Sequence, residues 1–216
     1  MKHALPLSWL SGAFLLLLAG CGGGPEEAPP WEVERLAGGG TEALGLRPGE
    51  STMGEALSRF GRRVEAALFE SPAGELTVEA HYGSVRVAGI AGALFLSLDL
   101  GSETLEALKR ASPGYMPQPS GGRRHELDAS FSDVLLDETI RVVSFSPQAT
   151  VTEETLAARF GEPAGRVTSA DGARHLLYPA VGTDVLVEPE GEVIIQYVHP
   201  RDFGWLRRRQ GLPEGP

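Results

Sequence analysis

The sequence predicts an α+β fold of two repeated units, each a short helix followed by an antiparallel β-meander. A shift of 100 residues lays segment 52–61 over segment 152–161, so that Thr52 meets Thr152 and the two Arg-Phe-Gly triplets coincide. Strand-length runs separated by turn signals follow each of these segments. The same pair of elements is therefore expected twice along the chain.

The two coinciding segments have the start and stop signals of helices. Thr52 is a suitable N-cap with Glu55 three residues later as a capping-box partner, and Thr152 is followed by two glutamates that suit the positive end of a helix. Gly61 and Gly161 are expected to end the helices in the left-handed conformation.

The runs after each helix are predicted to be strands because turn residues divide them. The predicted strands are 64–69, 75–82, 84–87 and 93–100 in the first half, and 166–170, 173–178, 184–188 and 192–198 in the second. The apolar run 87–96 is too short to span a membrane and is expected to be a turn and a central strand. Further helices are expected over 102–110 and 201–210.

Residues 1–20 have the pattern of a secretory signal peptide. A cationic start at Lys2 is followed by an apolar stretch that ends in four consecutive leucines, and then by small residues. Pro6 and Ser11 interrupt the apolar stretch, so a stable transmembrane helix is not expected. Cleavage is predicted between Gly20 and Cys21.

The segment Leu18-Ala19-Gly20-Cys21 resembles the lipobox of bacterial lipoproteins. The resemblance implies that Cys21 carries a covalent diacylglycerol and an N-acyl lipid, which hold the protein to a membrane. An ordinary secretory peptide that happens to contain a cysteine is the alternative. Gly22, in place of the aspartate that often signals inner-membrane retention, favours the periplasmic side of the outer membrane.

Composition divides the rest of the chain. Residues 21–40 are predicted to be the lipidated cysteine and a flexible tether, whose Trp31 is expected to dock on the first unit. Residues 41–112 are the first helix-plus-meander unit, 113–124 a Pro/Gly-rich linker, and 125–216 the second unit.

Charge and residue spacing exclude several functions. Removal of residues 1–20 changes the net charge from −10 to −11, which disfavours binding to nucleic acid. Cys21 is the single cysteine, so a disulfide is excluded once it is acylated. The histidines lack metal-ligand spacing, and no nucleophile elbow or phosphate loop occurs. We therefore expect no metal, no cofactor other than the lipid, and no catalytic residue.

The repeated segments resemble the SmpA/OmlA family, which includes the small accessory lipoprotein of the outer-membrane β-barrel assembly machinery. Phe160-Gly161-Glu162-Pro163 and Tyr178 match its pattern, and Phe60-Gly61 and Tyr82 match it in part. Arg62-Arg63 replaces the X-Pro of the family in the first half. The resemblance implies a fold shared with the tandem-repeat β-lactamase inhibitor proteins.

One cluster near the C-terminus has the composition of an interface. Phe203 and Trp205 precede Arg207, Arg208 and Arg209 in an otherwise acidic protein, and aromatic residues and arginines often anchor protein partners. The alternative is that the two aromatic residues cover the end of the sheet while the arginines lie in solvent at a helix C-terminus.

The sequence thus predicts a lipid-anchored envelope lipoprotein that acts as a non-enzymatic binding or scaffolding module. Its expected partner is a periplasmic or outer-membrane protein. An inhibitor of a secreted hydrolase is one alternative. A weak envelope enzyme, with a pocket that joins residues such as His81 and His175, is another.

Overall fold

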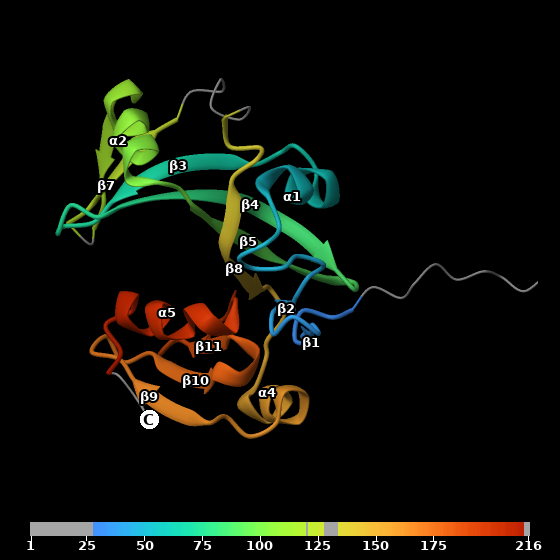
Figure 1. Ribbon diagram of the computed structural model, residues 1–216. Helices are drawn as coiled ribbons and strands as arrows, with labels where there is room; N and C mark the ends of the chain where they lie inside the picture. The colour runs from blue at the N-terminus through green and yellow to red at the C-terminus, as the bar shows by residue number, and fades with distance from the viewer. Residues whose placement is uncertain (1–27, 120, 128–133, 214–216) are drawn as a thin grey trace, which may run out of the picture.

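The computed structural model describes residues 28–119, 121–127 and 134–213, within which ten strands form one antiparallel sheet (Figure 1). The strand order is β6-β7-β3-β4-β5-β8-β12-β11-β10-β9, and β1 and β2 form a separate two-stranded ladder. The elements along the chain are β1 (Glu34–Arg35), β2 (Thr41–Glu42), α1 (Met53–Phe60), β3 (Glu65–Glu70), β4 (Leu76–Val87), β5 (Ile90–Asp99), α2 (Ser102–Ala111), β6 (Tyr115–Pro117), β7 (Arg123–Glu126), β8 (Thr139–Pro147), α4 (Glu153–Phe160), β9 (Gly165–Thr168), β10 (Arg174–Tyr178), β11 (Thr183–Val187), β12 (Val193–Val198) and α5 (Phe203–Arg209).

The predicted fold class, two repeated helix-plus-meander units, is wrong. Strand β8 was not predicted from the sequence, and it pairs with β5 on one side and with β12 on the other. The strands of the two halves of the chain are therefore joined edge to edge in a single sheet. Hydrogen bonds between backbones make that sheet continuous, and it has one core face along most of its length.

The helices of the two coinciding segments are confirmed. The Thr52 hydroxyl accepts from the Glu55 amide at 3.4 Å in α1, and the Thr152 hydroxyl accepts from the Thr155 amide at 3.3 Å in α4. Gly61 ends α1 with φ 91° and ψ 173°, a positive φ outside the left-handed helical region that the sequence predicted. Helices α2 and α5 also form where they were expected.

Two segments differ from the expected strand pattern. The predicted strands 75–82 and 84–87 are one strand, β4, with an irregular register between Tyr82 and Val85. Segment 113–124, expected to be a linker, carries β6 and the first residues of β7, which pairs with β3. This hairpin extends the sheet at its edge.

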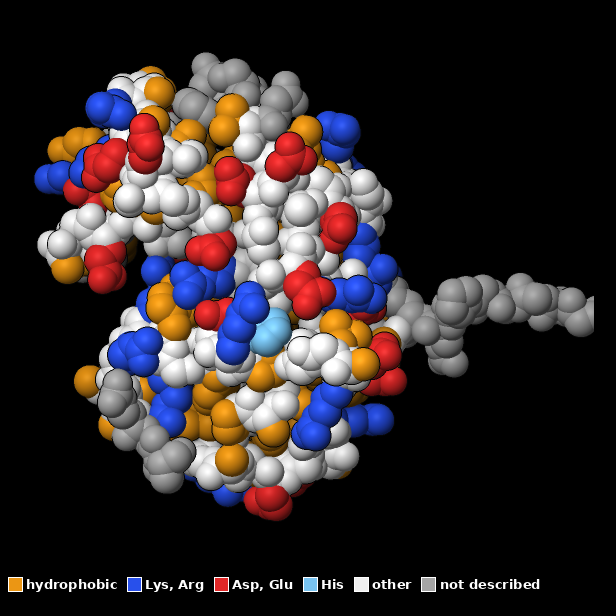
Figure 2. All heavy atoms as spheres, viewed as in Figure 1, with side chains coloured by type: hydrophobic (Ala, Val, Ile, Leu, Met, Phe, Trp, Pro, Cys, Tyr) orange, Lys and Arg blue, Asp and Glu red, His pale blue; other side chains and the backbone are white. Residues whose placement is uncertain are grey.

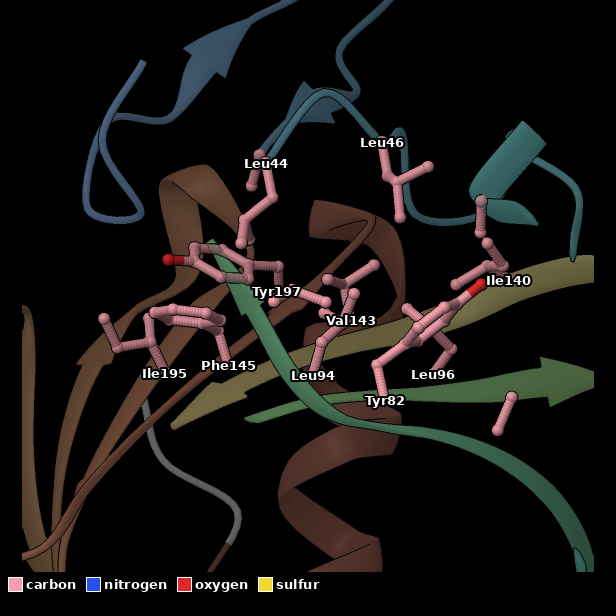
Figure 3. Packing of buried hydrophobic residues seen from close by; sticks show 14 of the residues in the cluster. Leu44, Leu46, Tyr82, Leu94, Leu96, Ile140, Val143, Phe145, Ile195 and Tyr197 are labelled. Atoms are coloured by element: carbon pink, nitrogen blue, oxygen red, sulfur yellow. The ribbon is translucent and has the colours of Figure 1, made fainter. Parts of the chain in front are cut away.

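The core lies on one face of the sheet, where apolar side chains alternate with polar ones that point to the other face. Figure 3 shows Tyr82, Leu94 and Leu96 beside Ile140, Val143 and Phe145, with Ile195 and Tyr197 on the neighbouring strand. Leu44 and Leu46 cover this layer and are 2% and 1% exposed. Complete burial of each such side chain contributes about 1.5–3 kcal/mol.

The N-terminal segment is attached to the second half of the sheet. The buried Tyr197 hydroxyl donates a hydrogen bond to the Pro30 carbonyl, and the Arg159 guanidinium of α4 lies 5.8 Å from the centre of the Trp31 ring. The expectation that Trp31 docks on the first unit is therefore wrong. The Trp31 ring lies beside α4 and Pro30 lies beside β12, and both of these elements belong to the second half of the chain (Figure 1).

Candidate functional site

Helix α5 packs on the face of the sheet opposite the core of Figure 3. Phe203 and Leu206 are 5% and 3% exposed and form a small apolar cluster with Val142, Leu177 and Val198. Phe203, a predicted partner contact, thus holds the helix to the sheet. A cleft lies between α5 and the strands β4 and β5.

Trp205 forms the rim of this cleft. The guanidinium carbon of Arg141 lies 3.8 Å from the centre of its ring, and that of Arg209 lies 5.6 Å away. Arg141 also donates to Asp99 at 3.3 Å and to Asp202 at 3.4 Å. The stack joins β8, β5 and α5 with charged groups attracted to the face of the indole.

A β-bulge places Arg141 in this position. Ser97 pairs with Val142 and Leu98 pairs with Ile140, so Arg141 is an additional residue on β8. Val142 therefore points to the α5 side while Val143 points into the core. Bulges re-aim side chains near functional sites, and this one directs a guanidinium to the cleft.

The outer part of the cleft has a volume of about 480 Å³. Its lining combines three arginines, two acids and apolar side chains from β4, β5, α2 and α5. The lining residues are Glu75, Leu76, Thr77, Ser97, Leu98, Asp99, Leu100, Leu105, Arg141, Trp205, Arg208 and Arg209. Figure 2 shows the hollow at the side of the molecule, with Lys and Arg side chains gathered along it.

An inner pocket of about 360 Å³ adjoins the outer cleft and shares Ser97 and Arg209 with it. Glu79 of β4 lies in this pocket, and burial raises the pKa of its carboxyl while the charge of Arg209 opposes that shift. Apolar side chains also line this pocket, namely those of Phe95, Val142, Ile194 and Leu206. The two pockets together bring arginines and a carboxyl group to the same face of the sheet.

The predicted cluster 203–209 therefore divides in the structure. Trp205, Arg208 and Arg209 line the cleft, whereas Phe203 is buried beneath the helix. Arg207 turns toward the C-terminal segment and donates to the Pro213 carbonyl. Arg209 donates to the Thr77 hydroxyl at 2.6 Å, which joins α5 to β4 across the cleft.

Sequence patterns did not predict the residues that β4, β5 and β8 contribute, above all Glu79, Ser97 and Arg141. A signal was present in β4, where Thr77, Glu79 and His81 alternate with buried Val78 and Ala80. Such alternation gives a strand one polar face, but it does not show which helix that face meets. The partner helix is more than a hundred residues later in the chain.

The histidines do not form a joint site. His81 stacks on Phe95 with 4.4 Å between ring centres, and His175 pairs with Asp184 at 2.8 Å beneath α5. Their strands, β4 and β10, are separated by four other strands of the sheet. Among the residues that the structure describes, no group of three or more potential ligands could hold a metal ion.

A separate ionic cluster holds α2 and β7 to the end of β3. The Glu70 carboxylate accepts from Lys109 at 2.7 Å and His125 at 3.0 Å, and Arg123 lies 3.4 Å away. The Lys109 hydrogen bond, followed by that of His125, lowers the pKa of Glu70 to about 2. This cluster stabilises the sheet edge.

The predicted lipid attachment at Cys21 and cleavage after Gly20 lie outside the described residues. Within 28–119, 121–127 and 134–213, the structure has no helix with the length and apolar character needed to cross a membrane.

Comparison with known proteins adds no relative. No family model matches the chain, and no curated protein or solved structure is significantly similar to it. The resemblance to the SmpA/OmlA family therefore stays a prediction.

Proposed function

We propose that this protein is a lipid-anchored lipoprotein of the bacterial outer membrane that binds another envelope protein, without catalysis, in the cleft beside α5. The observation that carries the proposal is the cleft itself, in which Trp205, Arg208 and Arg209 from α5 face the polar side of β4 and β5. Tryptophan and arginine are the residue types most often found at the energetic centre of protein interfaces.

The position of the anchor supports a protein partner. The first described residues lie beside β1 and β2, on the opposite side of the molecule from the opening of the cleft (Figures 1 and 2). Cys21 is seven residues before Ala28, so the intervening chain spans at most about 25 Å. Because Tyr197 holds Pro30 to the sheet, an anchor at Cys21 leaves the cleft open to the periplasm.

The size and shape of the cleft suit a segment of a partner. Interface centres combine apolar pockets with a polar rim, and the cleft has Leu76, Leu100 and Leu105 beside its charged side chains. The outer cleft leads into the inner pocket through Ser97 and Arg209. An extended segment in the outer cleft can therefore place one side chain in the inner pocket.

The test is photo-crosslinking in cells with the lipidated protein. A photoreactive amino acid replaces Arg208 in the cleft or, as a control, Glu190 in the exposed turn between β11 and β12. We expect one dominant envelope protein in adducts from position 208 and its absence from position 190. Equal adducts from both positions, or none from position 208, would contradict the proposal.

The identity of the adduct separates the proposed function from the inhibitor alternative. A hydrolase captured from position 208 that is also inhibited by the unlipidated Cys21→Ser protein would favour an inhibitor. A component of envelope assembly that requires the lipid anchor for capture would favour a scaffold.

A further inference from the structure

The inner pocket contains polar side chains without partners in the protein. Among the residues that the structure describes, none makes a hydrogen bond or ion pair with the carboxyl of Glu79 or a hydrogen bond with the hydroxyls of Ser97 and Ser144. Gln210 donates its amide to Gln196, and its Oε1 atom is buried without a partner. Buried polar groups in proteins are nearly always hydrogen-bonded, so the Gln210 Oε1 atom needs a donor that a ligand in this pocket can supply, beside the other three groups of the lining.

Most of these groups are acceptors, and one of them is an acid. The Gln210 Oε1 atom and the ionised Glu79 carboxylate only accept hydrogen bonds. A serine hydroxyl can donate a hydrogen bond and can also accept one. Among the described residues that line this pocket, Arg209 is the one cation. It donates to Thr77 and makes no ion pair with Glu79. A complementary ligand group therefore needs several donors and a positive charge.

The rest of the pocket is apolar. Phe95, Val142, Ile194 and Leu206 line it, and its volume of about 360 Å³ is at the lower end of the range for small-ligand sites. A hydroxyl group could bond to the acceptors but would not neutralise the acid. An anion would be repelled by Glu79, and a plain hydrocarbon would leave the polar groups unsatisfied.

We propose that the inner pocket binds a primary alkylammonium group, with its three N–H donors directed to Glu79, Gln210 and a serine hydroxyl and its alkyl stem against Phe95 and Ile194. The net charge of −10 attracts cations to the protein in general. The ammonium can belong to a lysine side chain of the partner, which rests on the proposed function, or to a free amine, which does not.

The test is calorimetric titration of the lipidated full chain in nanodiscs. The probes are n-butylammonium chloride, n-butanol and lysine blocked at both its amino and carboxyl ends. The variants are Glu79→Gln, which keeps the shape of the side chain, and Glu190→Gln, which makes the same change in the exposed turn between β11 and β12. Thermal unfolding of each variant establishes that it is folded.

We expect saturable binding of the ammonium probes and none of n-butanol. Glu79→Gln should weaken binding about tenfold or more, because it removes a charge-assisted hydrogen bond, and Glu190→Gln should change it less than about twofold. Arg209→Gln should strengthen binding, since it removes a competing cation. No saturable ammonium binding, or equal binding to the Glu79→Gln variant, would overturn the proposal.

The two probes separate the two sources of the ammonium. Tighter binding of blocked lysine supports a partner side chain, whereas binding of n-butylammonium alone supports a free amine. Ammonium binding in a protein that yields no crosslinked partner would contradict the proposed function and leave this site established. A crosslinked partner without ammonium binding would contradict only the site.

Discussion

The indole of Trp205 on α5 lies beneath the guanidinium of Arg141 on β8, whose central carbon is 3.8 Å from the ring centre. This contact is the point at which the C-terminal helix meets the strand that joins the two halves of the sheet. Because Arg141 also bonds to Asp99 and Asp202, one side chain links three segments of the cleft wall.

Replacement of Arg141 by Gln should lower the free energy of unfolding by about 1 kcal/mol, since it removes the stack and both ion pairs. Urea unfolding measures the change, with Arg110→Gln on the exposed side of α2 as the control. The control should differ from the unchanged protein by less than about 0.5 kcal/mol. An Arg141 variant as stable as the control would show that the stack does not hold α5.

The elements that the sequence predicted correctly are those set by neighbouring residues. The hairpin around Gly172 and the caps at Thr52 and Thr152 depend on contacts within a few residues. Strand β8 was not predicted because the bulge at Arg141 interrupts the alternation of side chains between the two faces. Ile140 and Val143 both point into the core although they are three residues apart, while Val142 points to the α5 side. Without that strand, the pattern suggested two separate units.

The candidate site was predicted only in part for a similar reason. Trp205 and the arginines after it form a compact signal in the sequence, and they lie at the cleft. Glu79 and Ser97 are single polar residues in ordinary strands, and their meeting with α5 depends on the order of strands across the sheet. Strand order is a long-range property that local patterns do not contain.

The Glu70 cluster should make stability depend on acid pH. The pKa of Glu70 is about 2 in the folded protein and near 4.5 ordinarily, so its contribution is complete above about pH 4.5 and is lost as pH falls toward 2. Glu70→Gln should remove this part of the decline in unfolding free energy between pH 5 and pH 2. Glu106→Gln, an exposed change on α2, should leave the decline unchanged.

Glu79 should have the opposite dependence. Burial raises its pKa, so ionisation is more costly in the folded protein, and stability is lost as pH rises through the folded pKa. Glu79→Gln should therefore raise the melting temperature at pH 7, and the difference should disappear at acid pH below the ordinary pKa of a glutamate. A melting temperature lowered at pH 7 would indicate that the acid has a counter-charge.

The close approach of β5 and β8 should make Gly92 sensitive to substitution. A Cβ atom at this position would lie 2.4 Å from Phe145 Cζ and 2.6 Å from the Ser146 carbonyl oxygen, so Gly92→Ala forces the central strands apart. We expect a loss of about 1–3 kcal/mol in unfolding free energy. Gly114→Ala has no atom within 4 Å of the added group and should be nearly neutral in the same measurement.

The hydrogen bond from Tyr197 to Pro30 should hold the N-terminal segment in place. Tyr197→Phe removes the donor and leaves the Pro30 carbonyl without it, which should cost about 1–2 kcal/mol and accelerate limited proteolysis near Trp31. Tyr82→Phe is the matched control, because the Tyr82 hydroxyl is buried with no partner among the described residues. Its removal should leave stability unchanged or raise it. Equal losses of stability in the two variants, with neither cleaved faster near Trp31, would show that the hydrogen bond to Pro30 does not hold the N-terminal segment in place.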